Sequence, residues 1–200
     1  MKTPTDEQLL ADVVRNRPDS FELLVRRHNA ELFRFVLRFT NNTVAAEDVV
    51  QEAFLQAYLS AASFDASRRF KPWLFTIAAN KARDWLRSRM RRSEVPLDAE
   101  IGSAGGAQTF LDLMSSDEES PEIELDHDDQ RRAVRRVIAE MPPLLREVLV
   151  LAYYHRFPYR EIAEILDIPV GTVKSRLHAA VGHFGRAYRS ESERLKENER

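Results

Sequence analysis

The residues best suited to binding chemistry cluster near the end of the chain, between positions 172 and 178. Each can form hydrogen bonds, and two of them are cationic. Apolar residues recur beside them in steps of four, at Val173, Leu177 and Val181, which predicts a helix with one apolar and one polar face. Such a polar face can contact phosphates and base edges. Its residues are Thr172, Lys174, Ser175, Arg176 and His178.

A second helix is predicted just before this one, over Tyr159–Leu166. Pro169 separates the two, because its ring cannot continue a helix and restrains the residue before it. Two helices joined by such a short turn form the helix-turn-helix pattern, whose second helix enters the major groove of DNA. An ordinary helical hairpin with a solvated face shows the same pattern, so both interpretations stay open for this segment alone.

Residues 1–92 are predicted to form a bundle of four helices, because apolar residues recur there at helical spacing. The third predicted helix, Ala45–Leu59, carries a compact polar patch at spacings of three and four residues. The patch consists of Asp48, Gln51 and Glu52. The other helices are predicted over Thr5–Val14, from Pro18 or Ser20 to about Phe39, and from Pro72 to about Arg92.

The fourth predicted helix combines cations with aromatic residues, and Asp84 is the only acid among them. This combination suits single-stranded or distorted nucleic acid, because cations contact phosphates while exposed bases stack on rings. Trp73, Phe75 and Trp85 are also ordinary core residues, and packing in the core is the favoured interpretation of these rings. The cations are Lys71, Lys81, Arg83, Arg87, Arg89, Arg91 and Arg92.

An acidic segment separates this first block from the helix-turn-helix. Residues 1–92 hold 16 Lys and Arg against 11 Asp and Glu, and residues 131–200 hold 14 against 9. Residues 93–130 hold 12 Asp and Glu with no Lys or Arg, so the net charge of -2 conceals two basic blocks. Glycine, serine and acidic residues predict a flexible linker over 93–126.

The second block, 127–190, is predicted to be another helical domain. The first predicted helix has Ala133–Met141 as its last part. A second covers Leu144–Tyr154, and the helix-turn-helix follows. Residues 191–200 are predicted to be a frayed, charged tail. No segment predicts a strand, so the expected fold class is all-α, with two small helical domains on a tether.

Composition excludes several classes of protein. The 200 residues include no Cys, which excludes disulfides and thiolate metal sites. No apolar run approaches the ~20 residues needed to span a bilayer, and the first residues lack the layout of a signal peptide. The five histidines are scattered and no glycine loop suited to phosphate is present, so neither an enzyme nor a cofactor is expected. We expect a soluble cytoplasmic protein.

Three segments, taken together in this order, carry a family resemblance. They are AEDVVQEAFLQAY (Ala46–Tyr58), RRFKPWLFTIAANKARDWLR (Arg68–Arg87) and YREIAEILDIPVGTVKSRLHAA (Tyr159–Ala180). They resemble, in turn, the polymerase-docking helix, the -10 melting and reading helix, and the -35 reading helix-turn-helix of bacterial extracytoplasmic-function (group IV) sigma factors of the sigma-70 family. The resemblance covers nearly the whole chain except the linker and the tail.

The resemblance implies a region 2-like domain over 1–92 and a region 4-like domain over 127–190. In the first, Asp48, Gln51 and Glu52 would dock on core RNA polymerase, at the clamp helices of its β′ subunit. Phe64 and Asn80 would form a pocket for a base flipped out of the opened -10 strand, because reading such a base requires taking it from the stack. The same -10 surface would include Lys71, Arg83, Asp84 and Arg87.

In the second domain, the resemblance gives Lys174, Ser175 and His178 base-reading positions on the -35 duplex, with Thr172 on the same surface and Arg176 on phosphate. Many members of the family have a basic residue where this chain has Ala179, so one DNA contact would be missing. The implied partners are core polymerase, through its β′ clamp helices and β flap, promoter DNA and an anti-sigma protein. No membrane insertion is implied.

Two other functions and one question about the linker stay open at this point. A sigma-like decoy would bind an anti-sigma protein without directing initiation, but it would not need the cations of the recognition helix. A plain helix-turn-helix regulator would not need the patch on Ala45–Leu59. The acidic linker either covers basic surfaces as a mimic of nucleic acid or serves as a solvated spacer.

Overall fold

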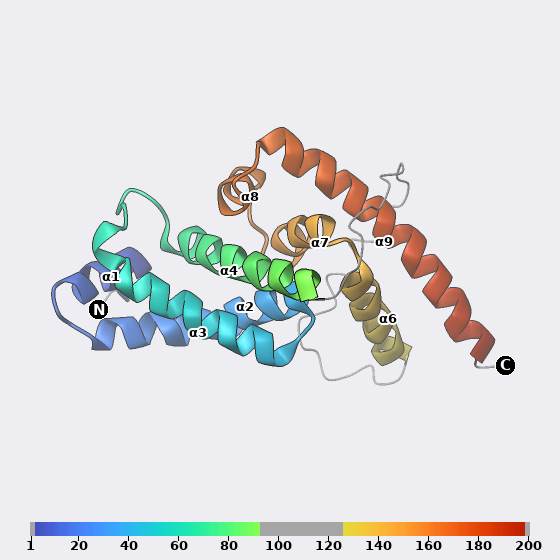
Figure 1. The fold of residues 1–200 in the computed structure, drawn as a ribbon, viewed down its shortest axis with the longest axis horizontal. Helices are drawn as coiled ribbons and strands as arrows, with labels where there is room; N and C mark the ends of the chain where they lie inside the picture. Colours follow the sequence, from blue (N-terminus) through green and yellow to red (C-terminus); the bar gives the residue numbers. More distant parts are fainter. Residues whose placement is uncertain (1–2, 93–125, 199–200) are drawn as a thin grey trace. The chain divides into compact units, whose positions relative to one another are not determined.

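A computed structural model describes residues 3–92 and 126–198, and all its regular elements there are helices. The chain divides into two compact units. Helices α1 to α4 belong to the first unit, and α6, α7 and α9 belong to the second (Figure 1). The predicted all-α fold class is confirmed. The predicted linker lies outside the described residues except for Asp126, where α6 begins.

The first unit consists of α1 (Asp6–Val14), α2 (Asp19–Thr40), α3 (Thr43–Leu59) and α4 (Phe70–Arg92). Thr5 caps α1 through a capping box with Gln8, and the Asn42 side chain caps α3 by accepting from the Ala45 N–H at 2.8 Å. Between α3 and α4 the chain forms a short 3-10 helix, η1 (Ala61–Ser63).

Helix α4 begins at Phe70, earlier than the predicted start at Pro72. The prediction was wrong because it took proline as the first helical residue. A proline is tolerated throughout the first turn, where backbone N–H groups have no partner within the helix. The earlier start is important because the Phe70 N–H is then the first backbone donor of the helix, whereas Pro72 has no N–H to donate.

The core of the first unit lies between α2, α3 and α4. Phe35 and Phe39 on α2 and Phe75 on α4 are fully buried, and the Phe35 and Phe75 rings lie 5.2 Å apart. Small residues on the facing sides of α3 and α4 are also buried, which lets these helices approach closely (Figure 1). These small residues are Ala46, Ala53, Ala57, Ala78 and Ala82.

The second unit is organised around α9 (Val170–Asn198), on which α6 (Asp126–Glu140) and α7 (Pro143–Leu149) pack. A π-helical turn, η3 (Val150–Tyr154), follows α7, so the single helix predicted over Leu144–Tyr154 is in fact two elements. The residues of η3, VLAYY, are all apolar or aromatic, so no pattern of apolar and polar residues there could reveal the change to π-type hydrogen bonding.

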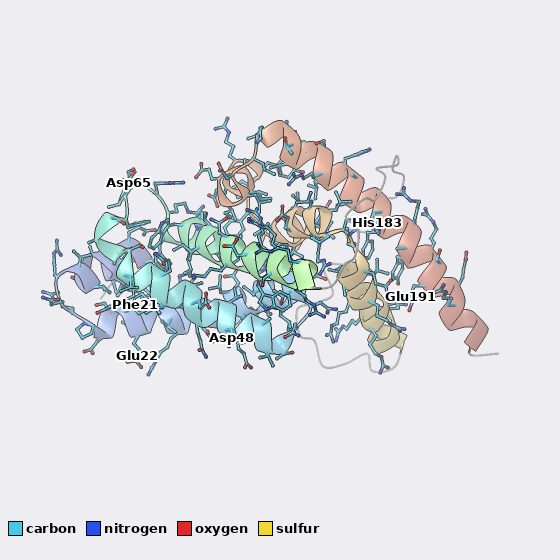
Figure 2. All side chains as sticks on the ribbon, viewed as in Figure 1. Phe21, Glu22, Asp48, Asp65, His183 and Glu191 are labelled. Carbon is cyan, nitrogen blue, oxygen red and sulfur yellow. The ribbon has the colours of Figure 1, made fainter. Side chains whose placement is uncertain are left out.

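Helix α9 continues through residues 191–198, where a frayed tail was predicted. A contact with α6 holds this end of the helix to the unit, since Arg136 on α6 pairs with Glu191 at 2.9 Å. Within α9 itself, the Phe184 and Tyr188 rings stack at 5.6 Å. The prediction of a frayed tail was based on the many charged residues in this segment. It was wrong because one of them, Glu191, has a partner on another helix. Figure 2 labels Glu191 and His183 on this helix.

Helix α8 (Tyr159–Leu166) precedes α9, and the turn between them contains Asp167 in the left-handed conformation, at a φ of 53°. Pro169 follows in this turn and accepts hydrogen bonds at its carbonyl from the N–H groups of Thr172 and Val173. Ile162 and Ile165 of α8 are buried, as predicted for its apolar face. None of the described helices is both long and apolar enough to span a membrane.

Candidate nucleic-acid interface

The outer face of the first turns of α9 carries the polar residues singled out from the sequence. Lys174, Ser175 and His178 are exposed, whereas Val173 and Leu177 are buried on the opposite face. Thr172 is half-buried, and its carbonyl accepts a hydrogen bond from the Ser175 hydroxyl at 3.1 Å. The exposed face of the helix thus carries a cation, a hydroxyl and an imidazole, while its opposite, apolar face is buried in the unit.

Arg176 lies differently from its neighbours on α9. Its Nη1 donates to Oε1 of Glu147 on α7 at 3.3 Å, and the Glu147 side chain is only 2% exposed. An isolated carboxylate at that depth would be costly, and the guanidinium offsets this cost. Arg176 therefore has a partner inside the unit, so a role on phosphate stays a prediction that the geometry does not favour.

Sequence reasoning missed Glu147. It lies in the run LLREVLVL, where Arg146 and Glu147 interrupt apolar residues, and both are buried. Burial lowers the pKa of Arg146, whose Nη2 donates to the Met141 carbonyl at 2.9 Å. Charged residues inside a strongly apolar helix were the available signal for such internal pairs.

Ala179 is 7% exposed, so its side chain faces the inside of the unit. The family resemblance implied that this chain lacks one DNA contact, because many members of the family have a basic residue at this position. In this structure a side chain at position 179 does not start from the outer face, and the alanine fits the packing.

Three aromatic rings surround the start of α4. The Phe64 ring lies 4.9 Å from Trp73 and 6.4 Å from Phe70, and Phe70 and Trp73 lie 5.9 Å apart. Phe70 is buried, while Phe64 and Trp73 are partly exposed. Phe75 is buried in the core, as the sequence analysis favoured for this ring. Phe64 and Trp73 are therefore the rings of this cluster that can contact a bound group.

The loop that carries Phe64 is ordered by its own hydrogen bonds. The Asp65 carboxylate accepts from the Ser67 N–H at 2.9 Å, and the Asp65 carbonyl accepts from the Arg68 N–H at the same distance. The hydrogen bonds from Ser67 lower the pKa of Asp65, which lies on the outside of this loop (Figure 2). The loop therefore presents Phe64 on a turn of defined shape.

The polar side chains of α4 are partly paired with one another. Asn80 is exposed and accepts a hydrogen bond from Arg83 at 3.3 Å, and Asp84 pairs with Arg87 at 3.3 Å. Lys71 pairs with Glu31 on α2 at 2.7 Å. Asn80, Arg83, Asp84 and Arg87 thus share one surface, while Lys71 is held toward α2.

Helix α3 carries a stripe of exposed residues, here called the α3 stripe: Asp48, Gln51, Glu52, Leu55 and Leu59. Steps of three and four residues keep all five on one side of the helix. Leu55 is 58% and Leu59 69% exposed, and Glu52 pairs with Lys81 at 3.0 Å. Figure 2 labels Asp48 on this helix. The sequence analysis identified the polar part but missed the leucines, although they continue the same spacing.

Comparison with known proteins bears on both units. The family model described as Sigma-70 region 2 matches residues 24–92, and the one described as Sigma-70, region 4 matches residues 131–184. The RNA polymerase sigma-H factor of Pseudomonas aeruginosa is 35% identical over 176 residues, covering 88% of this chain and 89% of that protein. The ECF RNA polymerase sigma factor SigW of Bacillus subtilis is 34% identical over 169 residues, covering 84% and 89%.

A solved structure resembles the fold. The sigma factor RpoE of Bartonella quintana, in complex with the anti-sigma factor NepR, matches with a TM-score of 0.63 at 23% identity. The match covers 84% of this chain and 96% of that one. At this level of identity, the likeness supports the fold.

Proposed function

Since this chain belongs to the extracytoplasmic-function sigma factors of the sigma-70 family, we propose that it binds core RNA polymerase and directs promoter-specific transcription initiation. In this proposal residues 1–92 form the domain that docks on polymerase and reads the -10 element. Residues 127–190 form the domain that reads the -35 element, and 93–126 link the two.

The observation that carries the proposal is the α3 stripe. Its acidic members, Asp48 and Glu52, would repel DNA, so the partner proposed for this face is a protein. Leu55 and Leu59 continue the stripe as exposed apolar groups, which are the usual centre of a protein interface. A regulator that only bound DNA would have no use for such a surface. We assign the stripe to the β′ clamp helices of core polymerase.

On the -35 duplex, Lys174, Ser175 and His178 are the proposed contacts, because they extend outward from the first turns of α9. Thr172 supports Ser175 through its carbonyl, and Arg176 anchors the helix on Glu147. The buried apolar side of α9 fixes the rotation of the helix about its axis. Direct hydrogen bonds to base edges in the major groove then discriminate sequence.

On the -10 element, Phe64 and Asn80 are proposed to hold a base of the opened non-template strand, with Arg83, Asp84 and Arg87 beside them. Flipping a base out of the stack costs a few kcal/mol. Stacking on an aromatic ring contributes about 1–3 kcal/mol per base, so one good contact offsets most of this cost. The partly exposed rings of Phe64 and Trp73 are placed to supply it.

The proposed partners are core polymerase, through its β′ clamp helices and β flap, promoter DNA and an anti-sigma protein. No chemistry of its own is assigned to the chain, since the family consists of transcription factors. We place its action in the cytoplasm, where the polymerase works.

Run-off transcription with core polymerase and a genomic promoter library tests the proposal. Specific start sites that depend on the protein are expected. Leu55→Ala should lower affinity for core polymerase by about fivefold or more, because central interface residues contribute over about 1 kcal/mol. Leu23→Ala is the matched control, since Leu23 is exposed to 44% but lies on α2, outside the α3 stripe.

Two results would refute the proposal in different ways. Binding to core polymerase without any initiation would indicate a decoy. Specific binding to duplex DNA without affinity for polymerase would indicate a plain helix-turn-helix regulator.

A further inference from the structure

Helix α1 supplies the cap of α4. Helix α4 follows residues 64–69, here called the Phe64 loop. Oε1 of Glu7 accepts a hydrogen bond from the Phe70 N–H at 3.0 Å, although the two residues are 63 positions apart. The first N–H groups of a helix lack partners within it, and a carboxylate there also suits the helix dipole. Glu7 thus fixes the first residue of α4 in place.

The protonation behaviour of Glu7 agrees with this geometry. Burial acts to raise its pKa, but hydrogen bonds from the Phe70 N–H, from its own N–H and from Thr5 outweigh burial and lower the pKa. Glu7 is therefore held as a carboxylate, the form that caps a helix best.

Asp6, the neighbour of Glu7, fastens α1 to α2. Its two carboxylate oxygens pair with Arg27 at 2.8 Å and with Nε2 of His28 at 2.7 Å. Arg27 also donates to the Pro4 carbonyl at 2.9 Å. The buried His28 ring lies 5.4 Å from the Phe70 ring, so this network reaches the same residue that Glu7 caps.

Helix α1 also packs against η1, the short helix just before Phe64. It therefore contacts the Phe64 loop at both ends, at η1 before the loop and at Phe70 after it. Phe70 in turn lies against Phe64 and Trp73, at 6.4 Å and 5.9 Å. A shift of α1 would therefore be transmitted to the Phe64 and Trp73 rings, on the Phe64 side of the proposed base pocket.

We infer that α1 is a brace for the -10 pocket, and that Glu7 and Asp6 are positioning residues for reading the opened strand without touching it. The inference rests on the proposed function, because it assumes that Phe64 and Asn80 hold the flipped base. It adds a specificity element at the beginning of the chain, outside the segments that contact DNA or polymerase.

The test uses the full-length protein in holoenzyme on a promoter obtained from the run-off library. Glu7→Ala removes the cap, and Glu7→Gln keeps an acceptor oxygen but removes the charge. Glu22→Gln is the matched control, because Glu22 pairs only across an exposed turn of α2, with Arg26. Permanganate reactivity of -10 thymines measures the open complex, filter binding of labelled promoter DNA measures the closed complex, and fluorescence polarisation of the labelled protein measures affinity for core polymerase.

We expect Glu7→Ala to lower the open-complex fraction by about tenfold and Glu7→Gln by about threefold, as the loss of a charge-assisted cap predicts. Core affinity and closed-complex formation should match the wild type, as should every property of Glu22→Gln. The Glu7 variants should also discriminate less between the selected promoter and copies with single -10 substitutions. A merely structural role would lower opening equally on all of these templates.

The inference fails if Glu7→Ala opens the promoter like the wild type, or if its loss of opening is matched by an equal loss of core affinity. Phe64→Ala, measured in parallel, separates this failure from failure of the proposed function. If Phe64→Ala opens normally, the base pocket itself is wrong, and the brace is wrong with it. If Phe64→Ala is defective and Glu7→Ala is normal, the pocket stands and only the brace is overturned.

Discussion

Replacing Arg176 by methionine should destabilise the second unit rather than simply weaken DNA binding. The substitution keeps the aliphatic length of the side chain but removes the guanidinium that donates to Glu147 at 3.3 Å. The carboxylate of Glu147, on a side chain 2% exposed, then loses a partner that it cannot replace with bulk water. Stability, and not only affinity, is therefore the property to measure.

The structure sets the size of the effect. Removing one partner of a fully buried ion pair costs about 3–5 kcal/mol. The Arg176 side chain is 24% exposed, so water can enter from its side. Because this side chain is partly solvated, we expect Arg176→Met to lower the free energy of unfolding of the second unit by about 2–3 kcal/mol. The double variant with Glu147→Gln should lose less than the sum of the single variants, because the two residues are in direct contact and the carboxylate charge at position 147 is then absent.

The positions of the tryptophans make the assay specific to one unit. The chain has 2 Trp, Trp73 and Trp85, and both lie in the first unit. In urea, tryptophan fluorescence therefore reports unfolding of the first unit, whereas far-UV circular dichroism reports both. Arg176→Met should shift a transition seen by dichroism and leave the fluorescence transition in place.

Lys174→Met is the matched control, since Lys174 is an exposed cation on the same helix. It should change stability by less than about 0.5 kcal/mol while weakening binding to a -35 duplex and reducing its salt dependence. If Arg176→Met instead behaves like Lys174→Met, with unchanged dichroism, the Glu147 pair does not anchor the helix and Arg176 acts on phosphate.

Four further outcomes are expected. Phe35→Ala should destabilise the first unit by about 3–5 kcal/mol, because a fully buried ring is lost, and should lower the urea midpoint of tryptophan fluorescence. Asp167→Gly should stabilise the turn between α8 and α9 by about 0.5–1 kcal/mol in dichroism, since Asp167 has a φ of 53°. Gly171→Ala should stabilise the second unit by about 0.5 kcal/mol, because an added Cβ meets nothing within 4 Å. The lowered pKa of Glu7 means that its contribution to stability is present above the ordinary value of 4.5 and is lost as pH falls below it. Acid unfolding of the first unit followed by fluorescence should therefore be less steep in Glu7→Gln.

Apolar spacing predicted most of the helices, because each helix buries a stripe that repeats every three or four residues. The all-α class and the buried faces of α8 and α9 follow from this local rule, as does the polar part of the α3 stripe. Local rules also explain Thr5 and Asn42, whose side chains cap the helices that they precede.

Pairs between distant residues could not be predicted in this way. Glu7 caps Phe70, Glu147 pairs with Arg176, and Glu191 pairs with Arg136, each joining different helices. A single sequence shows that these side chains are charged but not which of them meet. The end of α9 was misjudged for this reason, and the pair of Arg176 with Glu147 could not be foreseen.

The pair of Glu147 and Arg176 has a consequence for changing the promoter preference of such a factor. Along the outer turns of α9, position 176 is tied to the interior, whereas Lys174, Ser175 and His178 face outward. A library that randomises all four positions would consist mostly of clones destabilised by the loss of the pair with Glu147. Varying 174, 175 and 178 while keeping Arg176 leaves the scaffold intact, so new -35 specificities should be sought, and natural divergence should concentrate, at those three positions.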